Sequence, residues 1–127
     1  MESTRSKGNF IENHATAYLM RQGYRILARN YAYRGGELDI VAQDGNTTVF
    51  VEVKSVWSNS QGNPAARVNA AKQKKVWKTA CHFLATQVKN LDQKSRFDVL
   101  ALRAYESPMH FYHYKDAFEG TQVIPQC

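Results

Sequence analysis

The sequence predicts an α/β protein in which helices flank a mixed β-sheet, and three observations support that prediction. Two segments carry apolar residues at helical spacing, whereas others alternate apolar and polar residues as strands do. The segments run in the order helix, three strands, helix and two further strands. The 127 residues, 43% of them hydrophobic, suffice for one core. Residues 1–127 are therefore expected to form a single domain with loose ends at 1–8 and 120–127.

The first helix is predicted from Asn9 to about Gln22, because apolar residues recur there at helical spacing. Asn9 suits the N-cap position, and Gly23 suits the position just after the helix end. Glu12 lies at the edge of the apolar stripe, so its carboxylate is expected beside the core. The apolar positions are Ile11, Ala15, Tyr18 and Leu19.

A strand is predicted from Tyr24 to Tyr33, and Gly35-Gly36 separates it from a β-hairpin. Asp44-Gly45 is a strong signal for the hairpin turn, and Gly45-Asn46 is the alternative. Both turns give the same distribution of side chains between the two faces. One face is then wholly apolar, with Leu38, Ile40, Ala42, Val49, Val51 and Val53.

The opposite face of the hairpin is charged and is the best clue to function. It carries Glu37, Asp39, Glu52 and Lys54. With the Asp44-Gly45 turn, Glu37 lies opposite Glu52, and Asp39 is diagonal to it. Crowded carboxylates destabilise a sheet unless something neutralises them, and a divalent cation would do so. A surface salt-bridge cluster is the alternative interpretation.

The second half of the chain predicts a loop, a helix and two strands. The loop runs from Ser58 to Pro64, and the helix from about Ala66 to Val88. Gln73 falls within the apolar side of this helix, either as a structural amide or as support for the site. A core strand is predicted at 96–103, and an edge strand or the final arm of a hairpin at 109–114. The apolar side of the helix comprises Ala70, Trp77, Ala80, Cys81, Leu84 and Val88.

The net charge of +6 is unevenly distributed. Between Ser3 and Leu91 there are thirteen Lys and Arg residues against five acids, and from Val53 to Leu91 there is no acid at all. This bias predicts a surface that binds a polyanion such as nucleic acid, with a charge for solubility as the alternative.

The two cysteines, Cys81 and Cys127, fit neither a metal-ligand spacing nor a disulfide framework. A reducing cytoplasm is therefore expected, with Cys81 as a small core residue. The polar segment from Met1 to Lys7 lacks the apolar stretch of a secretory signal, and no apolar run predicts a membrane span.

An ordered set of short motifs runs through most of the chain: Glu12, Gly23-Tyr24, Arg29-Asn30, Gly36 to Ala42, Phe50 to Lys54, Gly62 to Pro64, Lys72, Arg96 to Val99 and Ala117-Phe118. Together they resemble the YraN-like family, also called uncharacterised protein family 0102. That family is similar to the PD-(D/E)xK nucleases, which include archaeal Holliday-junction resolvases and restriction enzymes. The resemblance implies a restriction-endonuclease-like mixed sheet with an αβββαβ core.

The resemblance also implies roles for individual residues. Asp39 corresponds to the acid of the PD half-motif, and Glu52 and Lys54 to the (D/E)xK half. These two acids and the Val53 carbonyl would bind Mg²⁺ or Mn²⁺, and Lys54 would orient or activate the attacking water. Glu12 matches the helix-borne acid of resolvase-like members and is a further candidate ligand, unless it merely favours a helix N-terminus.

The expected function is a metal-dependent endonuclease acting on DNA, structure-specific or resolvase-like. The alternative is a nucleic-acid-binding module with weak or absent catalysis that assists repair or uptake, and RNA is a third possibility as substrate. Val56 stands where the family usually has an arginine, and Ile11 where it usually has a glycine. Because resolvase relatives are two-fold dimers, a homodimer is expected.

Glu37 is predicted either to pair with an arginine or to support the metal ligands. Phosphate contacts are predicted for basic side chains of the first strand and the second helix. These are Arg25, Arg29, Arg34, Lys72, Lys74, Lys75 and Lys78.

Overall fold

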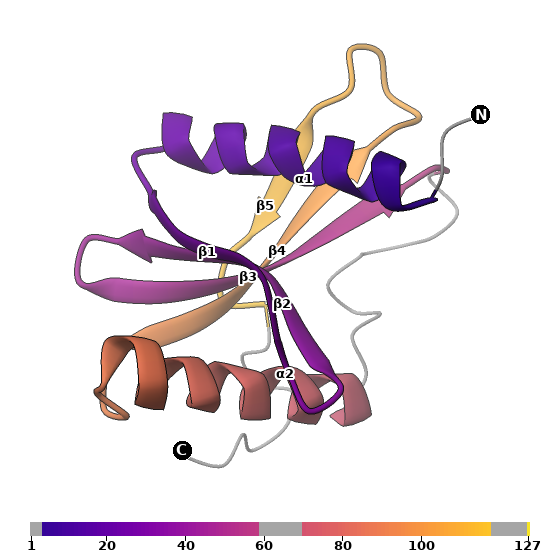
Figure 1. The fold of residues 1–127 in the computed structure, drawn as a ribbon. Helices are drawn as coiled ribbons and strands as arrows, with labels where there is room; N and C mark the ends of the chain where they lie inside the picture. The colour runs from indigo at the N-terminus through magenta and orange to yellow at the C-terminus, as the bar shows by residue number, and fades with distance from the viewer. Residues whose placement is uncertain (1–3, 59–69, 118–126) are drawn as a thin grey trace.

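A computed structural model describes residues 4–58, 70–117 and 127, with side chains described from Phe10. Two helices enclose a central sheet, with α1 on one face and α2 on the other (Figure 1). The predicted loop at 59–64, the first residues of the predicted second helix at 66–69 and the tail at 118–126 lie outside the described residues. The elements are α1 (Thr4–Arg21), β1 (Arg25–Tyr33), β2 (Gly36–Asp44), β3 (Thr47–Val56), α2 (Ala70–Phe83), a π-helical turn (Leu84–Val88), β4 (Ser95–Arg103) and β5 (Phe111–Tyr114).

The sheet has five strands in the order β1-β2-β3-β4-β5. The pairs β1–β2, β2–β3 and β4–β5 are antiparallel, whereas β3 and β4 are parallel. The chain crosses between the two parallel strands through α2, since a parallel pair needs a long connection. This mixed sheet flanked by helices confirms the predicted α/β class and is consistent with a restriction-endonuclease-like fold.

Two apolar cores form because the central strands are buried on both faces. On the α1 side, Leu19 packs with Ile40 and Leu100. On the α2 side, Val76 and Phe83 pack with Phe50. The alternation predicted from sequence is therefore confirmed for most of the hairpin, with one exception: Leu38 belongs to the α2-side core. The β2–β3 ladder begins at Ile40–Val51, whereas Leu38 pairs with β1 near the end of β2 that approaches α2.

The hairpin turn is Gly45-Asn46, so the preferred Asp44-Gly45 turn was wrong and the alternative is confirmed. Gly45 has a φ of +59° at the first turn position, where glycine avoids the steric cost that Asp44 would meet in the other turn. Asp44 instead pairs with Thr47 at the end of the ladder.

Both helices differ in detail from the prediction. Helix α1 begins at Thr4, so Asn9 is an interior residue rather than the N-cap, and residues 4–8 are helical. The buried side of α2 is centred on Val76 and Phe83, and Ala70 is exposed. Thr79 is fully buried because its hydroxyl donates to the Lys75 carbonyl at 2.9 Å, which removes the cost of burying a polar group.

Cys81 and Cys127 form a disulfide with a Cα–Cα distance of 5.4 Å. The prediction of two unpaired cysteines was therefore wrong, and Cys81 is half-buried rather than a core residue. The cysteines thus give no support to a reducing compartment. Neither described helix combines the length and the apolar content needed to cross a bilayer.

Replacing Gly36 by Ala is expected to destabilise the protein by about 3 kcal/mol, because β2 begins directly against α2. A Cβ at this position would lie 2.7 Å from the Lys75 carbonyl oxygen, which is backbone and cannot turn away. Gly45→Ala is the control: no described atom lies within 4 Å of its added Cβ, so its cost is limited to the positive φ, about 1 kcal/mol. Urea unfolding compares the two, and equal costs would contradict the close approach.

Candidate active site

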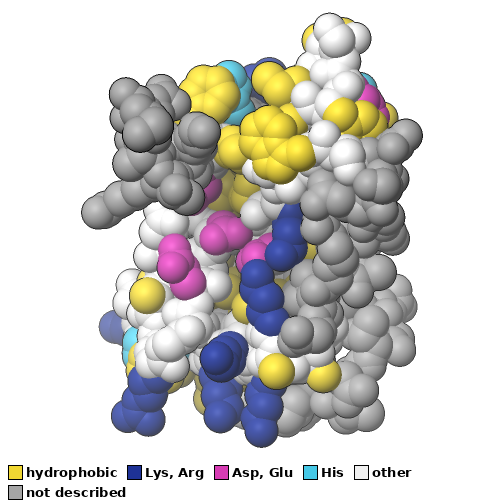
Figure 2. All heavy atoms as spheres, turned by 90° about the vertical axis from the view of Figure 1, so that its right-hand side faces the viewer, with side chains coloured by type: hydrophobic (Ala, Val, Ile, Leu, Met, Phe, Trp, Pro, Cys, Tyr) yellow, Lys and Arg dark blue, Asp and Glu magenta, His cyan; other side chains and the backbone are white. Residues whose placement is uncertain are grey.

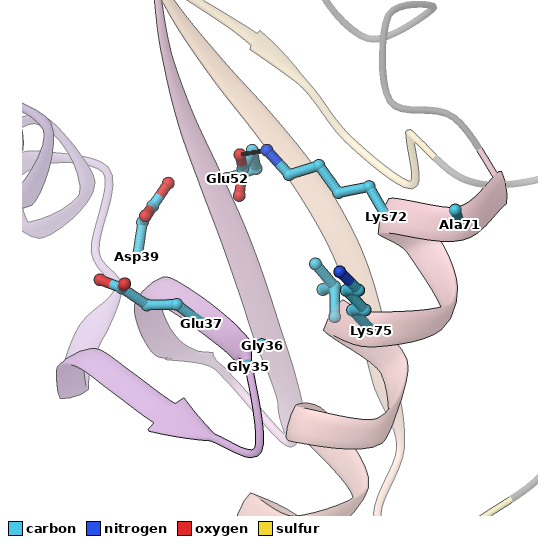
Figure 3. A pocket seen from close by; sticks show the side chains of 9 residues that line it. Gly35, Gly36, Glu37, Asp39, Glu52, Ala71, Lys72 and Lys75 are labelled. Atoms are coloured by element: carbon cyan, nitrogen blue, oxygen red, sulfur yellow. Dashed lines mark hydrogen bonds and ion pairs between the residues drawn. The ribbon is translucent and has the colours of Figure 1, made fainter.

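The charged face of the hairpin forms one wall of a pocket of about 520 Å³. Figure 3 shows Glu37 and Asp39 on β2 and Glu52 on β3, with Lys72 and Lys75 reaching from α2 on the other side. The three carboxylates predicted from sequence to share a face therefore line one pocket. We call it the acidic pocket. The other described lining residues are Gly35, Gly36, Ala71 and Val76. Of these, the sequence indicated only Gly35 and Gly36, the glycine pair that precedes the hairpin.

The acidic pocket raises the pKa of Asp39. Ile40 pairs with Val51, so Asp39 and Glu52 are the next residues along their strands, and Asp39 rather than Glu37 is the nearer partner of Glu52. Burial, then the charge of Glu52 and further that of Glu12, raise the pKa of Asp39 to about 7. The Val53 N–H donates to Asp39 Oδ2 at 2.8 Å, which opposes the rise and orients the carboxylate. Two acids thus compete for charge in this pocket.

Glu52 is held between two lysines. Lys72 Nζ lies 2.5 Å from Glu52 Oε1, and Lys54 Nζ lies 3.7 Å from the same oxygen. Burial disfavours the charged form of Lys72, but the hydrogen bond and charge of Glu52 outweigh it and raise the pKa of Lys72. Lys72, predicted from sequence to contact phosphate, therefore places its ammonium group on a candidate metal ligand.

Glu12 reaches the site from α1. Its side chain is largely buried, and its Oε1 lies 3.5 Å from Arg29 Nε, beyond good hydrogen-bond geometry. Among the described residues this oxygen has no hydrogen-bond donor, although a buried carboxylate normally has one. Because α1 starts at Thr4, Glu12 is not in the first turn, and the interpretation as a helix N-terminal acid was wrong. Its charge instead acts on Asp39.

Glu37 lines the acidic pocket but has an exposed side chain. No described arginine forms an ion pair with Glu37, and Arg67 lies outside the described residues, so the pairing with an arginine stays a prediction. Its cross-strand neighbour on β1 is Ala32, which offers no charge. Gln73 is buried in α2 as its position predicted, outside the described lining of the acidic pocket.

The basic residues predicted to contact phosphate divide into three groups. Lys72 and Lys75 line the acidic pocket, while Lys74, Lys78 and Arg34 line a neighbouring pocket. Arg29 pairs with Glu12, and Arg25 lies at the far end of β1, opposite Gln43. In Figure 2, acidic side chains occupy the centre of one face, with Lys and Arg side chains beside and below them. Arg25 is therefore remote from the acids, whereas the lysines of α2 adjoin them.

The acidic pocket suits a hard cation bound by few protein ligands. Within the described residues, no three carboxylate, histidine or cysteine side chains form a metal-binding cluster. Mg²⁺ usually takes one or two carboxylates and keeps several waters, so the pair Asp39 and Glu52 meets that requirement. A bound cation would relieve the repulsion that raises the pKa of Asp39, and it would also favour the buried Glu12 carboxylate at longer range.

A model of the family described as "Uncharacterised protein family UPF0102" matches residues 11–102. The chain belongs to the UPF0102 family. This confirms the resemblance seen in its motifs. The chain is 44% identical over 115 residues to a UPF0102 protein of Geobacter metallireducens, covering 91% of this chain and 93% of the relative. It is 45% identical over 113 residues to one of Syntrophus aciditrophicus (88% and 87%) and 40% identical over 114 residues to one of Clostridium tetani (88% and 93%).

The part of the chain that matches the UPF0102 model extends from Ile11 in α1 to Leu102 in β4. It includes every described residue that lines the acidic pocket, together with Glu12 and Lys54. The described lining of the acidic pocket therefore lies within the segment that matches the family model.

Proposed function

We propose that this UPF0102 protein is a metal-dependent endonuclease that hydrolyses phosphodiester bonds of DNA. The observation that carries the proposal is the pair Asp39 and Glu52, set on adjacent strands in one lysine-lined pocket, with the pKa of Asp39 raised to about 7. Strongly perturbed acids in a cleft are typical of functional sites. The resemblance to PD-(D/E)xK nucleases supports the same assignment.

Asp39, Glu52 and the Val53 carbonyl would hold Mg²⁺ or Mn²⁺, with Glu12 favouring the cation through its charge. When bound, the metal supplies a polarised water and neutralises phosphate charge. Lys54, beside Glu52, would orient that water and stabilise the charge that develops on the phosphate oxygens. Lys72 balances Glu52 without metal, and a bound cation would release its ammonium group to contact phosphate.

The basic side chains next to the acidic pocket would hold the nucleic-acid backbone, chiefly Lys75 and its neighbours on α2. Such contacts position a substrate without reading its sequence. We therefore propose that the protein selects nucleic-acid structure or strand ends rather than base sequence. DNA is the proposed substrate, a two-fold homodimer stays a prediction, and RNA is the substrate to be tested beside DNA.

Two observations favour the alternative of a binding module without useful catalysis. Lys72 already neutralises Glu52, which lowers the need for a metal in the pocket. Valine at position 56 also offers no cation near the site. In this case the fold and the basic surface would bind nucleic acid and recruit another repair or uptake protein.

A cleavage assay on linear, nicked and four-way DNA with Mg²⁺ or Mn²⁺ separates the two functions. The wild type is expected to cut at least one substrate, and chelation of the metal is expected to stop it. Lys54→Ala should lower the rate by about 100-fold or more, because it removes a positive charge from the reacting phosphate. The exposed Lys115, outside the pocket, provides the control Lys115→Ala, with the same charge change and little expected effect.

Retention of the full rate by Lys54→Ala would contradict the proposed role of that lysine. If no substrate is cut under any metal condition while the wild type still binds DNA, the enzyme proposal fails and the binding module is favoured. RNA oligonucleotides in the same assay decide between the two nucleic acids.

A further inference from the structure

A second pocket, of about 730 Å³, lies between the end of β1 and α2 and adjoins the acidic pocket. Lys75 lines both pockets, and the turn that joins β1 to β2 lies over α2 (Figure 1). We call it the aromatic pocket. Its lining is mostly apolar and includes Trp77 and Leu91, whereas the acidic pocket is bounded by charges.

Two aromatic rings of this pocket are held in a fixed stack. The rings of Tyr33 and His82 are nearly parallel, at 12°, with centroids 3.8 Å apart. The Tyr31 hydroxyl lies 2.6 Å from His82 Nδ1, which fixes the orientation of the imidazole. Both Tyr33 and His82 are half-buried, so part of the stack faces the pocket. A preorganised aromatic platform of this kind costs little entropy when a flat ligand stacks on it.

Positive charge surrounds the platform. Arg34 Cζ lies 5.2 Å from the Tyr33 ring centroid, and Lys74, Lys75 and Lys78 follow on α2. All four cations are exposed, and none of them forms an ion pair with a described residue. No described side chain of the pocket lining is acidic. The charges therefore complement an anionic ligand that also carries a flat aromatic group.

We propose that the aromatic pocket binds unpaired nucleotides of a nucleic-acid strand, with bases on the Tyr33–His82 platform and phosphates on Arg34, Lys74 and Lys78. Proteins that bind single strands combine a basic groove with aromatic side chains on which bases stack. Bases inside a duplex are stacked on one another and cannot enter such a pocket without being extruded. The pocket therefore distinguishes single-stranded from fully paired nucleic acid.

The position of the aromatic pocket gives the proposed endonuclease its substrate class, and this step rests on that function. A strand with its scissile phosphate in the acidic pocket would pass Lys75 and place neighbouring nucleotides on the platform. The preferred substrate is then a duplex with a single-stranded tail, gap or open branch next to the cleavage point. A fully paired linear duplex leaves the aromatic pocket empty and binds less tightly.

Binding is measured by fluorescence anisotropy in a chelator, so that no cleavage is needed. The probes are a labelled thymidine oligonucleotide of about 12 nucleotides and a blunt duplex of equal length. Tyr33→Leu should weaken binding of the single strand by about 10-fold or more and binding of the duplex by less than about 2-fold. Tyr33→Phe keeps the ring and should bind the single strand as the wild type does.

A second variant tests the phosphate contacts and does not disturb the core. Lys74→Ala with Lys78→Ala should reduce the slope of log affinity against log salt by about 1.4 for the single strand. The matched control is Lys94→Ala with Lys115→Ala, which removes the same charge from exposed positions outside the pocket. The control should leave the slope nearly unchanged.

Two results would overturn the inference. One is a folded Tyr33→Leu protein that binds the single strand as tightly as the wild type. The other is a lysine pair whose removal changes the salt slope no more than its control does. If Tyr33→Leu and the lysine pair both have the expected effects on binding but the wild type never cuts DNA, the proposed endonuclease is disproved. The aromatic pocket then remains a single-strand binding site.

Discussion

Replacing Asp39 by Asn is expected to abolish cleavage and, without metal, to stabilise the fold by about 2–4 kcal/mol at neutral to alkaline pH. Burial, the charge of Glu52 and that of Glu12 raise the pKa of Asp39 from 3.8 to about 7, so the folded protein disfavours the ionised acid. Asparagine removes the charge and keeps an oxygen that accepts the Val53 N–H. Loss of a metal ligand and gain of stability would therefore occur together.

The pH dependence follows from the direction of this shift. A raised carboxylate pKa contributes stability that is fully present below the unfolded pKa, near 3.8, and is lost as pH rises through about 7. The gain from Asp39→Asn should thus be small at about pH 4–5 and largest at about pH 8. Urea unfolding at both pH values, without divalent metal, measures this gain in the free energy of unfolding. Glu52, Glu12 and Lys72 interact electrostatically with this carboxylate, and Lys54 lies beside Glu52.

Glu37→Gln is the matched control, because Glu37 lines the same pocket but is exposed. Its effect on stability should stay within about 0.5 kcal/mol at every pH. Mg²⁺ should raise the melting temperature of the wild type and have little effect on Asp39→Asn. A destabilised Asp39→Asn protein at pH 8 would show that the carboxylates do not repel each other in the folded state.

Replacing Asp98 by Ala is expected to destabilise the protein by about 3–5 kcal/mol, a loss at least as large as that expected for Gly36→Ala. Asp98 is fully buried in β4 and accepts hydrogen bonds from Arg96 Nε at 3.0 Å and from the Asp116 N–H at 3.0 Å. His113 Nε2 lies 2.7 Å from the second oxygen of the carboxylate. Alanine would leave these donors buried around a cavity without an acceptor.

Asp44→Ala is the matched control for Asp98, since both acids pair with Arg96. The Asp44 side chain is 40% exposed, so its loss should cost about 1 kcal/mol or less. Urea unfolding at pH 7 compares the two variants, and equal costs would mean that the buried carboxylate contributes no more than a surface pair.

The pKa of Asp98 adds a second check. Burial raises it, but hydrogen bonds from His113, Arg96 and the Asp116 backbone outweigh burial, so the pKa of Asp98 lies below its usual value. A lowered carboxylate pKa contributes stability above the unfolded pKa, and this stability is lost as pH falls through the folded pKa. The difference between wild type and Asp98→Ala should therefore shrink in acid.

Asp39 and Asp98 illustrate what sequence patterns can and cannot predict. Alternation in the hairpin predicted that Asp39 and Glu52 share a face, because strand geometry sends every second side chain to the same side. The register of the two strands was not predicted correctly. The Asp44-Gly45 and Gly45-Asn46 turns both place glycine in the turn, and they differ in whether Asp44 or Gly45 takes the first turn position, which has a positive φ in the structure. Asp98 drew attention only as part of a motif, and nothing near it in sequence indicated that His113 would reach it from β5.

The sequence by itself determined the order of the elements, the α/β class, the shared face of Glu37, Asp39, Glu52 and Lys54, and the basic character of the region around them. These properties depend on residues that are neighbours along the chain, where periodicity and turn chemistry act. Only the tertiary structure decided that Glu12 acts on Asp39, that Lys72 neutralises Glu52, that Tyr33 stacks on His82 and that Cys81 bonds Cys127. Each of these pairs joins residues far apart in sequence, and they meet only because the sheet and the two helices bury their apolar faces against one another.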